Sequence, residues 1–308
     1  MNTQEILSQS KTKTWKIEQL ILAGLRRTEI ATLVTSGNYG FVQNVYAKMK
    51  RENRLNLIAT VNFQPSPFDR KFGVEIEAYG IEKEVLARAL RAEGINCQVE
   101  NYNHTTGSSW KIVSDGSLEG SNTFELVSPI LEGIEGLNNL EIVCRVLEAK
   151  HVKINKTCGL HVHFDAELIN LQQIKNTLIN YAKLEGEIDN FMPMSRRGNT
   201  NTYCKSIIGY EERIERAVTL DKLINTFGSR YFKVNLQSYR RHRTIEFRQH
   251  SGTVEFLKIS NWILFLHNLV SYSKTEKLSS NANFETLKKF NQVEILNYII
   301  TRQNQLAA

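Results

Sequence analysis

The chain has 308 residues, of which 41% are hydrophobic and 23% are charged, a composition that excludes a disordered or fibrous protein. No apolar run reaches the ~20 residues needed to cross a bilayer, and the polar first twenty residues carry no secretion signal, so we expect a cytoplasmic protein with no membrane contact. The four cysteines are widely spaced and form no CxxC pair, which fits a reducing compartment.

The net charge of +7 is concentrated near the N-terminus. Residues 1–60 hold nine Lys and Arg against four Asp and Glu, whereas the remaining residues hold 30 against 28. A basic N-terminal part beside a nearly neutral remainder indicates two functions, the first involving a polyanion. A basic domain that is simply solvated explains the same charge distribution.

The N-terminal part predicts three short helices, over residues 11–23, 28–34 and 39–50, because apolar residues recur there at helical spacing. The third helix carries one apolar stripe made of Phe41, Val42, Val45, Tyr46 and Met49. Its opposite face carries polar side chains that suit base edges and phosphates: Gln43, Asn44, Lys48 and Lys50. Residues 1–57 therefore resemble a helix-turn-helix domain that binds DNA. A trihelical cap that packs on a protein surface is the alternative.

Residues 58–69 hold two of the chain's four prolines and are the best candidate for a linker. The remainder, 70–308, predicts strands over 71–79, 95–101, 110–113, 123–126, 158–165, 230–237 and 244–249. It predicts helices over 82–93, 137–150, 170–191, 218–227, 253–273 and 293–302. This irregular order of strands and helices indicates an α+β fold with a largely antiparallel sheet and flanking helices.

Several predicted strands alternate apolar residues with ionisable ones, so that the ionisable side chains share one face. Eight such side chains follow this pattern: Glu75, Glu77, Glu125, His161, His163, Glu246, Arg248 and His250. Each short motif alone is usual on a solvated strand. These positions, however, contain no Lys, Thr or Ser, which an ordinary solvated face would include. Gathered on one face, the carboxylates would repel one another unless cations bind. Oxygen-rich ligation with imidazole suits Mg²⁺ or Mn²⁺ better than zinc, and the arginine suits a phosphate.

The motifs occur in a characteristic order: FGVEIE at 72–77, Trp110 followed by DGSL at 115–118, ELVSP at 125–129, GLHVH at 159–163, SRR at 195–197 and TIEFRQHSGT at 244–253. Together they resemble the putative amidoligase family, which belongs with glutamine synthetase and glutamate–cysteine ligase among the carboxylate–amine ligases. The resemblance covers residues 70–255, and the N-terminal helices lie outside it.

The resemblance implies a glutamine synthetase-like catalytic fold, in which the concave face of the sheet holds ATP and two or three divalent ions. It implies five metal ligands: Glu75, Glu77, Glu125, His161 and Glu246. Arg248 would contact the transferring phosphate. Arg196 and Arg197 correspond to arginines that serve the ATP phosphates or the substrate carboxylate, although a pair of solvated loop charges is the alternative.

Two further positions keep more than one interpretation. His163 either supports the ligands or contacts the nucleotide, and Asp115 matches a position that supports the substrate or the metal. We count Glu246, Arg248 and His163 as the catalytic set. The proton of the attacking amine would go to a carboxylate, to His163 or to His250, and spacing alone does not assign it.

The function expected from this resemblance is ATP-dependent amide formation through an acyl phosphate, with a carboxylate and an amine (an amino acid, peptide or polyamine) as substrates. Three alternatives remain open. They are a metal-dependent hydrolase built on the HxH motif, a phosphotransferase on the same sheet, and a non-enzymatic DNA-binding regulator.

Overall fold

The computed structural model describes residues 3–22, 25, 27–52, 67–101, 103, 105–278 and 282–307. The chain divides into two compact units, one formed by residues 1–65 with 283–308 and the other by residues 66–282. Most of the predicted linker, 58–66, lies outside the described residues. The C-terminal residues 283–308, which the sequence analysis placed in the catalytic domain, group by their contacts with the N-terminal helices. The predicted bounds of the catalytic domain, residues 70–308, stay a prediction.

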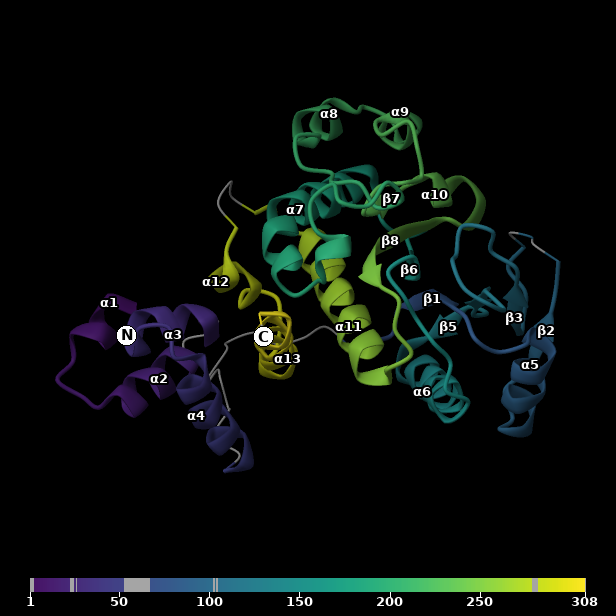
Figure 1. The fold of residues 1–308 in the computed structure, drawn as a ribbon. Coiled ribbons are helices and arrows are strands. Elements are labelled where there is room, and N and C mark those ends of the chain that lie inside the picture. Colours follow the sequence, from purple (N-terminus) through teal and green to yellow (C-terminus); the bar gives the residue numbers. More distant parts are fainter. Residues whose placement is uncertain are drawn as a thin grey trace. The chain divides into compact units, whose positions relative to one another are not determined.

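The first unit is helical in its described residues (Figure 1). Its helices are α1 (Thr3–Ser8), α2 (Lys13–Leu22), α3 (Arg27–Thr35), α4 (Tyr39–Arg51), α12 (Phe284–Leu287) and α13 (Val293–Leu306). The three predicted helices are confirmed, whereas α1 was missed. Helix α4 begins after Asn38, whose side chain accepts a hydrogen bond from the Phe41 backbone. Its apolar stripe is buried except for Phe41, which is exposed.

The second unit is built on one sheet with the strand order β2-β3-β4-β1-β6-β8-β7, and β5 pairs with β1. The strands are β1 (Lys71–Ala78), β2 (Cys97–Val99), β3 (Trp110–Val113), β4 (Phe124–Val127), β5 (Leu131–Glu132), β6 (Gly159–Asp165), β7 (Val234–Asn235) and β8 (Thr244–Ser251). Among the strands of the described residues, the β2–β3 pair alone is parallel, so the predicted α+β architecture with a largely antiparallel sheet is confirmed.

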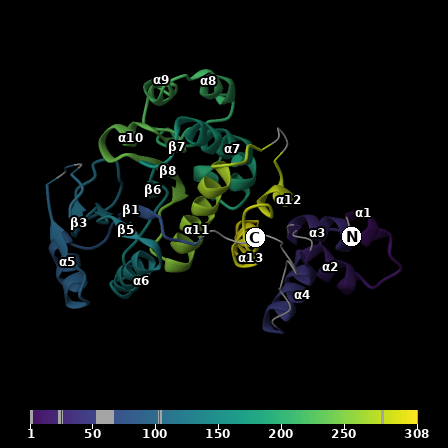
Figure 2. The ribbon, with the colours of Figure 1, turned by 180° about the vertical axis from the view of Figure 1, so that it is seen from behind.

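The helices of the second unit are α5 (Lys83–Ala92), α6 (Gly133–Ala149), α7 (Leu171–Asn190), α8 (Glu211–Arg216), α9 (Leu220–Asn225), α10 (Gln237–His242) and α11 (Phe256–Ser273), with a 3₁₀ turn η1 at Met194–Arg196. One face of the sheet is apolar and covered by some of these helices. Helix α11 packs against both α6 and α7 and lies between them, as the reverse view in Figure 2 also shows. On this face the Phe247 ring of β8 contacts Phe164 of β6 and Tyr181 of α7. No described helix is long and apolar enough to cross a membrane.

The prediction of one strand over 230–237 is only partly right. Strand β7 has two residues, and helix α10 follows at once. The Asn235 side chain accepts a hydrogen bond from the Gln237 backbone, and the Ser238 hydroxyl donates to the Asn235 carbonyl. These local hydrogen bonds compete with further strand pairing, so the chain turns into a helix.

Two helical glycines allow a test of the packing under the sheet. A Cβ at Gly136 of α6 would lie 2.9 Å from Leu131 Cβ and from the Phe72 ring, whereas a Cβ at Gly186 of α7 would meet nothing within 4 Å. We expect Gly136→Ala to lower the free energy of unfolding by about 1–3 kcal/mol. The matched control Gly186→Ala should raise it by about 0.4–1 kcal/mol. Urea denaturation of both variants checks this, and equal effects would contradict the packing described.

Candidate active site

The open face of the sheet carries the predicted ionisable side chains because strand pairing brings them level. Glu75 of β1 lies opposite His161 of β6, and Glu77 lies opposite Glu125 of β4. On the other side of β6, His163 lies opposite Glu246 of β8. These three strand pairings therefore bring together residues that are far apart in the sequence. Glu75 and Glu246, for example, are 171 positions apart.

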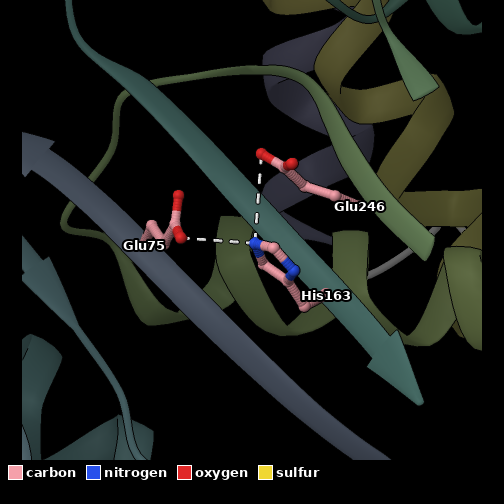
Figure 3. A group of neighbouring side chains, drawn as sticks. All are labelled: Glu75, His163 and Glu246. Atoms are coloured by element: carbon pink, nitrogen blue, oxygen red, sulfur yellow. Dashed lines mark ion pairs between the residues drawn. The ribbon is translucent and has the colours of Figure 1, made fainter. Parts of the chain in front are cut away.

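Glu75 lies at the centre of this group. Its carboxylate is 2.9 Å from His161 Nδ1 and 3.3 Å from His163 Nε2. The same His163 nitrogen is 3.9 Å from Glu246, so the imidazole lies between two carboxylates (Figure 3). His161 Nε2 is 3.6 Å from Glu77. These distances join the two histidines to Glu75, Glu77 and Glu246. Glu125 belongs to the same cluster because its donor atoms lie within 4.8 Å of those of Glu75 and Glu77.

The charges in the cluster shift one another's ionisation. Burial raises the pKa of Glu125 well above its usual value, and the negative charges of Glu75, Glu77 and Asp115 add to this effect. Burial also acts to raise the pKa of Glu75, but His163 and His161 outweigh it and hold that pKa well below the usual range. Glu125 thus sits where negative charge is in excess and where a cation would be stabilised.

Among the described residues, three groups of side chains have the donor atoms and spacing to hold a metal ion. They are Glu75 with His163 and Glu246, Glu75 with Glu125 and His161, and Glu77 with Asp115 and Glu125. Within each group the donor atoms lie within 4.8 Å of one another. Glu75 and Glu125 each belong to two groups, as ligands bridging adjacent ions would. From the sequence, Asp115 was expected to support the substrate or the metal, and His163 was expected to be catalytic and either to support the ligands or to contact the nucleotide.

Gly159 allows the close approach on which part of the cluster depends. Its backbone N–H donates to Glu77 Oε2 at 2.5 Å. A Cβ at this position would lie 3.0 Å from His161 Nε2 and 3.2 Å from Glu77. A larger residue would therefore push apart the glutamate and the imidazole.

Two of the three predicted arginines join the site. The Arg248 guanidinium donates to Glu246 and lies 3.4 Å from His161 Nδ1. Burial disfavours its charge, but Glu246 and Glu75 more than compensate and raise the pKa of Arg248. Arg196, in η1, is buried and lines a cavity that also contains Arg248 and the carboxylates. Arg197 is not among the residues that line this cavity, and its Nε donates to the Met192 carbonyl.

The predicted alignment of His250 with Glu246 and Arg248 is wrong. A β-bulge shifts the register between β6 and β8, so that Val162 pairs with Phe247 but Leu160 pairs with His250. The extra residue returns His250 to the apolar face. There its ring lies 5.6 Å from that of Trp262 in α11. His250 is therefore no base for this site.

Two cavities meet at the cluster. The larger, of 1130 Å³, contains the carboxylates together with Arg196, Arg230, Arg240, Arg241 and Arg248. The smaller, of 270 Å³, has an apolar wall that includes Val127, Pro129 and Ile130. The two cavities share four residues: Glu75, Glu125, His163 and His242. The candidate cation groups thus stand at the junction of a basic cavity and a smaller, more apolar one.

A buried ionic network supports the basic side. Lys233 has no exposed surface, and its ammonium contacts Glu185 at 2.8 Å and Asp189 at 2.7 Å. These two carboxylates also accept the backbone N–H groups of Ile207 and Gly198. The network therefore holds both ends of the 198–207 segment against α7, next to Arg196.

Sequence reasoning missed several of these residues. Asn235 donates to Glu246 at 2.5 Å and was not singled out, because an asparagine at a strand end is normally part of a turn. No sequence motif includes Lys233, Glu185 or Asp189. Only their contacts in the folded protein distinguish them. The arginine-rich stretch before β8 was a usable signal, since Arg240 and Arg241 line the larger cavity.

An ionisable cluster on an antiparallel sheet, next to an arginine-lined cavity, defines an enzyme-like site that suits cations and an anionic ligand. The family model described as putative amidoligase enzyme matches residues 69–270. The chain belongs to this family, which confirms the resemblance drawn from the motifs, and the family name supports an amide-forming ligase. A search of curated proteins finds no match.

The buried network yields a stability prediction. Lys233→Met leaves the buried Glu185 and the partly buried Asp189 without their cation, so we expect the free energy of unfolding to fall by about 3–5 kcal/mol. Lys277 pairs with Glu215 at 3.1 Å, and both side chains are more than 40% exposed. The control Lys277→Met should therefore cost at most about 1 kcal/mol. Thermal and urea unfolding measure both. Equal losses would show that burial of the Lys233 charge is unimportant.

Proposed function

We propose that this protein is an ATP-dependent carboxylate–amine ligase that forms an amide bond through an acyl phosphate, using Mg²⁺ or Mn²⁺. The observation that carries the proposal is the position of the three candidate cation groups at the junction of two cavities. Family membership supports the ligase reaction, and the glutamine synthetase-like fold is part of the proposal.

The donor set fits divalent ions that prefer oxygen. Carboxylates outnumber imidazoles in every group, and the third group has carboxylates only. We assign one ion to Glu75, His163 and Glu246 and a second to Glu75, Glu125 and His161. Bound there, such ions would neutralise charge on the β- and γ-phosphates during phosphoryl transfer.

The larger cavity suits ATP because arginines line it together with the carboxylate cluster. Arg248 is anchored by Glu246 and would stabilise the charge on the transferring phosphoryl group. Arg196 would bind a phosphate oxygen with its planar guanidinium. We leave Arg197 out of the site. The smaller, more apolar cavity would hold the acid and the amine.

The reaction then has two steps. A carboxylate oxygen of the acid attacks the γ-phosphorus, the bond to the β–γ bridging oxygen breaks, and ADP leaves. The amine nitrogen next attacks the acyl carbon, loses a proton, and displaces inorganic phosphate. The cluster would hold the γ-phosphate at the shared boundary of the two cavities, within reach of the acid.

Four free cysteines, all buried, support a reducing cytoplasm as the location.

A screen of amino acids, peptides and polyamines for Mg-ATP-dependent phosphate release, with product mass as readout, tests this function. We expect release only with an acid and an amine together, and a product that has lost one water. Arg248→Ala and Glu246→Gln should each lower kcat by at least about 100-fold. The control Arg216→Ala removes a guanidinium that is 77% exposed and should leave kcat unchanged.

Other outcomes of the screen would identify the alternatives. A stable phosphorylated product without an amide would indicate a phosphotransferase. Cleavage without ATP that depends on zinc would indicate a hydrolase. The absence of turnover with every pair would favour a non-enzymatic regulator.

A second proposal concerns α4, which we infer binds DNA. Asn44 and Lys48, about one turn apart on α4, are exposed, and Lys50 is exposed further round the helix, so all three are free to contact bases or phosphates. Gln43, the fourth residue named from the sequence, accepts a hydrogen bond from Arg27, which also donates to the Asn304 carbonyl. We therefore assign Gln43 to packing within the first unit and keep the other three as the DNA-contacting set.

Replacement of Lys48 and Lys50 by alanine in the full chain tests this second proposal. If both contact phosphates, the slope of log K against log salt should become shallower by about 0.9 per lysine. A gel-shift or anisotropy titration at several salt concentrations measures the slope. Wild-type protein that shows no DNA affinity even at low salt would refute the assignment.

A further inference from the structure

A pair of tyrosines lines the larger cavity together with the carboxylate cluster. Tyr203 follows η1, and Tyr231 precedes β7. Their ring centroids are 5.3 Å apart at an interplanar angle of 81°. Tyr203 is 49% exposed, which is unusual for a large aromatic side chain on a cavity wall. The edge-to-face contact thus leaves ring surface of Tyr203 open to a ligand.

Hydrogen bonds of the backbone hold the two segments that carry the rings. Tyr203 N–H donates to the Asn201 side chain at 2.8 Å, and Tyr231 N–H donates to the Ser229 hydroxyl at 3.0 Å. Lys205 N–H donates to the Tyr231 carbonyl at 2.9 Å, which ties the two segments side by side. The segments that carry the rings are therefore held in place, and a ligand that stacks on the rings would lose little free energy in ordering these segments.

The length of the connecting chain limits the distance between the tyrosines and the candidate cation groups. The chain runs from Tyr231 to Asn235, which hydrogen-bonds Glu246. Four residues of fully extended chain span at most about 14 Å. Along the way, the Lys233 carbonyl accepts the Arg248 backbone N–H at 2.8 Å. One cavity thus has an aromatic wall and a cation-binding floor, separated by a length that a nucleoside triphosphate can bridge.

Charge on this wall also suits an aromatic base next to phosphates. The Arg230 guanidinium lies 5.3 Å from the centre of the Tyr231 ring. Arg230 lines the cavity, as do Arg196 and Arg248 near the carboxylates. Stacked aromatic rings bind the π-face of a base, whereas arginines bind phosphates.

We propose that Tyr203 and Tyr231 form the site for the purine base of the nucleotide, with the exposed ring of Tyr203 stacking on the base. This inference rests on the proposed use of ATP and adds the residues that bind its base. Because stacking accepts any base, the site would discriminate weakly between adenine and guanine nucleotides.

Calorimetry with ATP and with inorganic triphosphate, each with Mg²⁺, tests the assignment on the full chain. Tyr203→Ala should weaken ATP binding at least about fivefold, the loss expected from one base–aromatic stack, and leave triphosphate binding unchanged. Tyr203→Phe keeps the ring and should bind ATP as the wild type does. Tyr231→Leu, a second variant, should weaken ATP binding in the same selective way.

The outcomes separate this inference from the proposed function. If wild-type protein binds ATP but Tyr203→Ala and Tyr231→Leu bind it equally well, the base site is wrong while the ligase proposal stands. Equal losses for ATP and triphosphate would also overturn it, since they would place Tyr203 near the phosphates. Wild-type protein that binds neither ligand would refute the use of ATP and, with it, the base site.

Discussion

The structure depends on a concentration of negative charge that strand pairing imposes on one face of the sheet. Glu75, Glu77 and Glu125 come from two antiparallel neighbours, and Glu246 faces them across β6. Two carboxylates about 4 Å apart repel by about 4 kcal/mol at an effective dielectric constant of about 20. The histidines and Arg248 relieve part of this repulsion. Burial, together with the negative charges of Glu75, Glu77 and Asp115, still raises the pKa of Glu125.

The opposite face supplies the stability that such a cluster requires. Apolar residues at alternate positions pack against α6, α7 and α11, and Phe164, Phe247 and Tyr181 form an aromatic cluster there. Beneath the basic side of the larger cavity, Lys233 neutralises two acids of α7 and fixes the segment next to Arg196. Rigid support of this kind is what holds an active site in a geometry that the free side chains would not adopt.

The sequence predicted those parts of the site that follow a regular period. Alternation along β1, β6 and β8 placed Glu75, His161 and Glu246 on a common face, as observed. It failed at His250, because a bulge adds one residue to β8, and alternation cannot reveal a bulge. Helix α10 was missed because side-chain hydrogen bonds at Asn235 end the strand. The Lys233 network depends on contacts between distant segments, which no local pattern encodes.

The most direct test of the central claim is a crystal structure with Mn²⁺, with the ion located by its anomalous scattering. A cation-dependent ligase site predicts anomalous peaks on the open face of the sheet, one between Glu75 and Glu246 and one between Glu75 and Glu125. Saturating Mn²⁺ that leaves this face without a peak, or that binds only elsewhere on the protein, would contradict the claim.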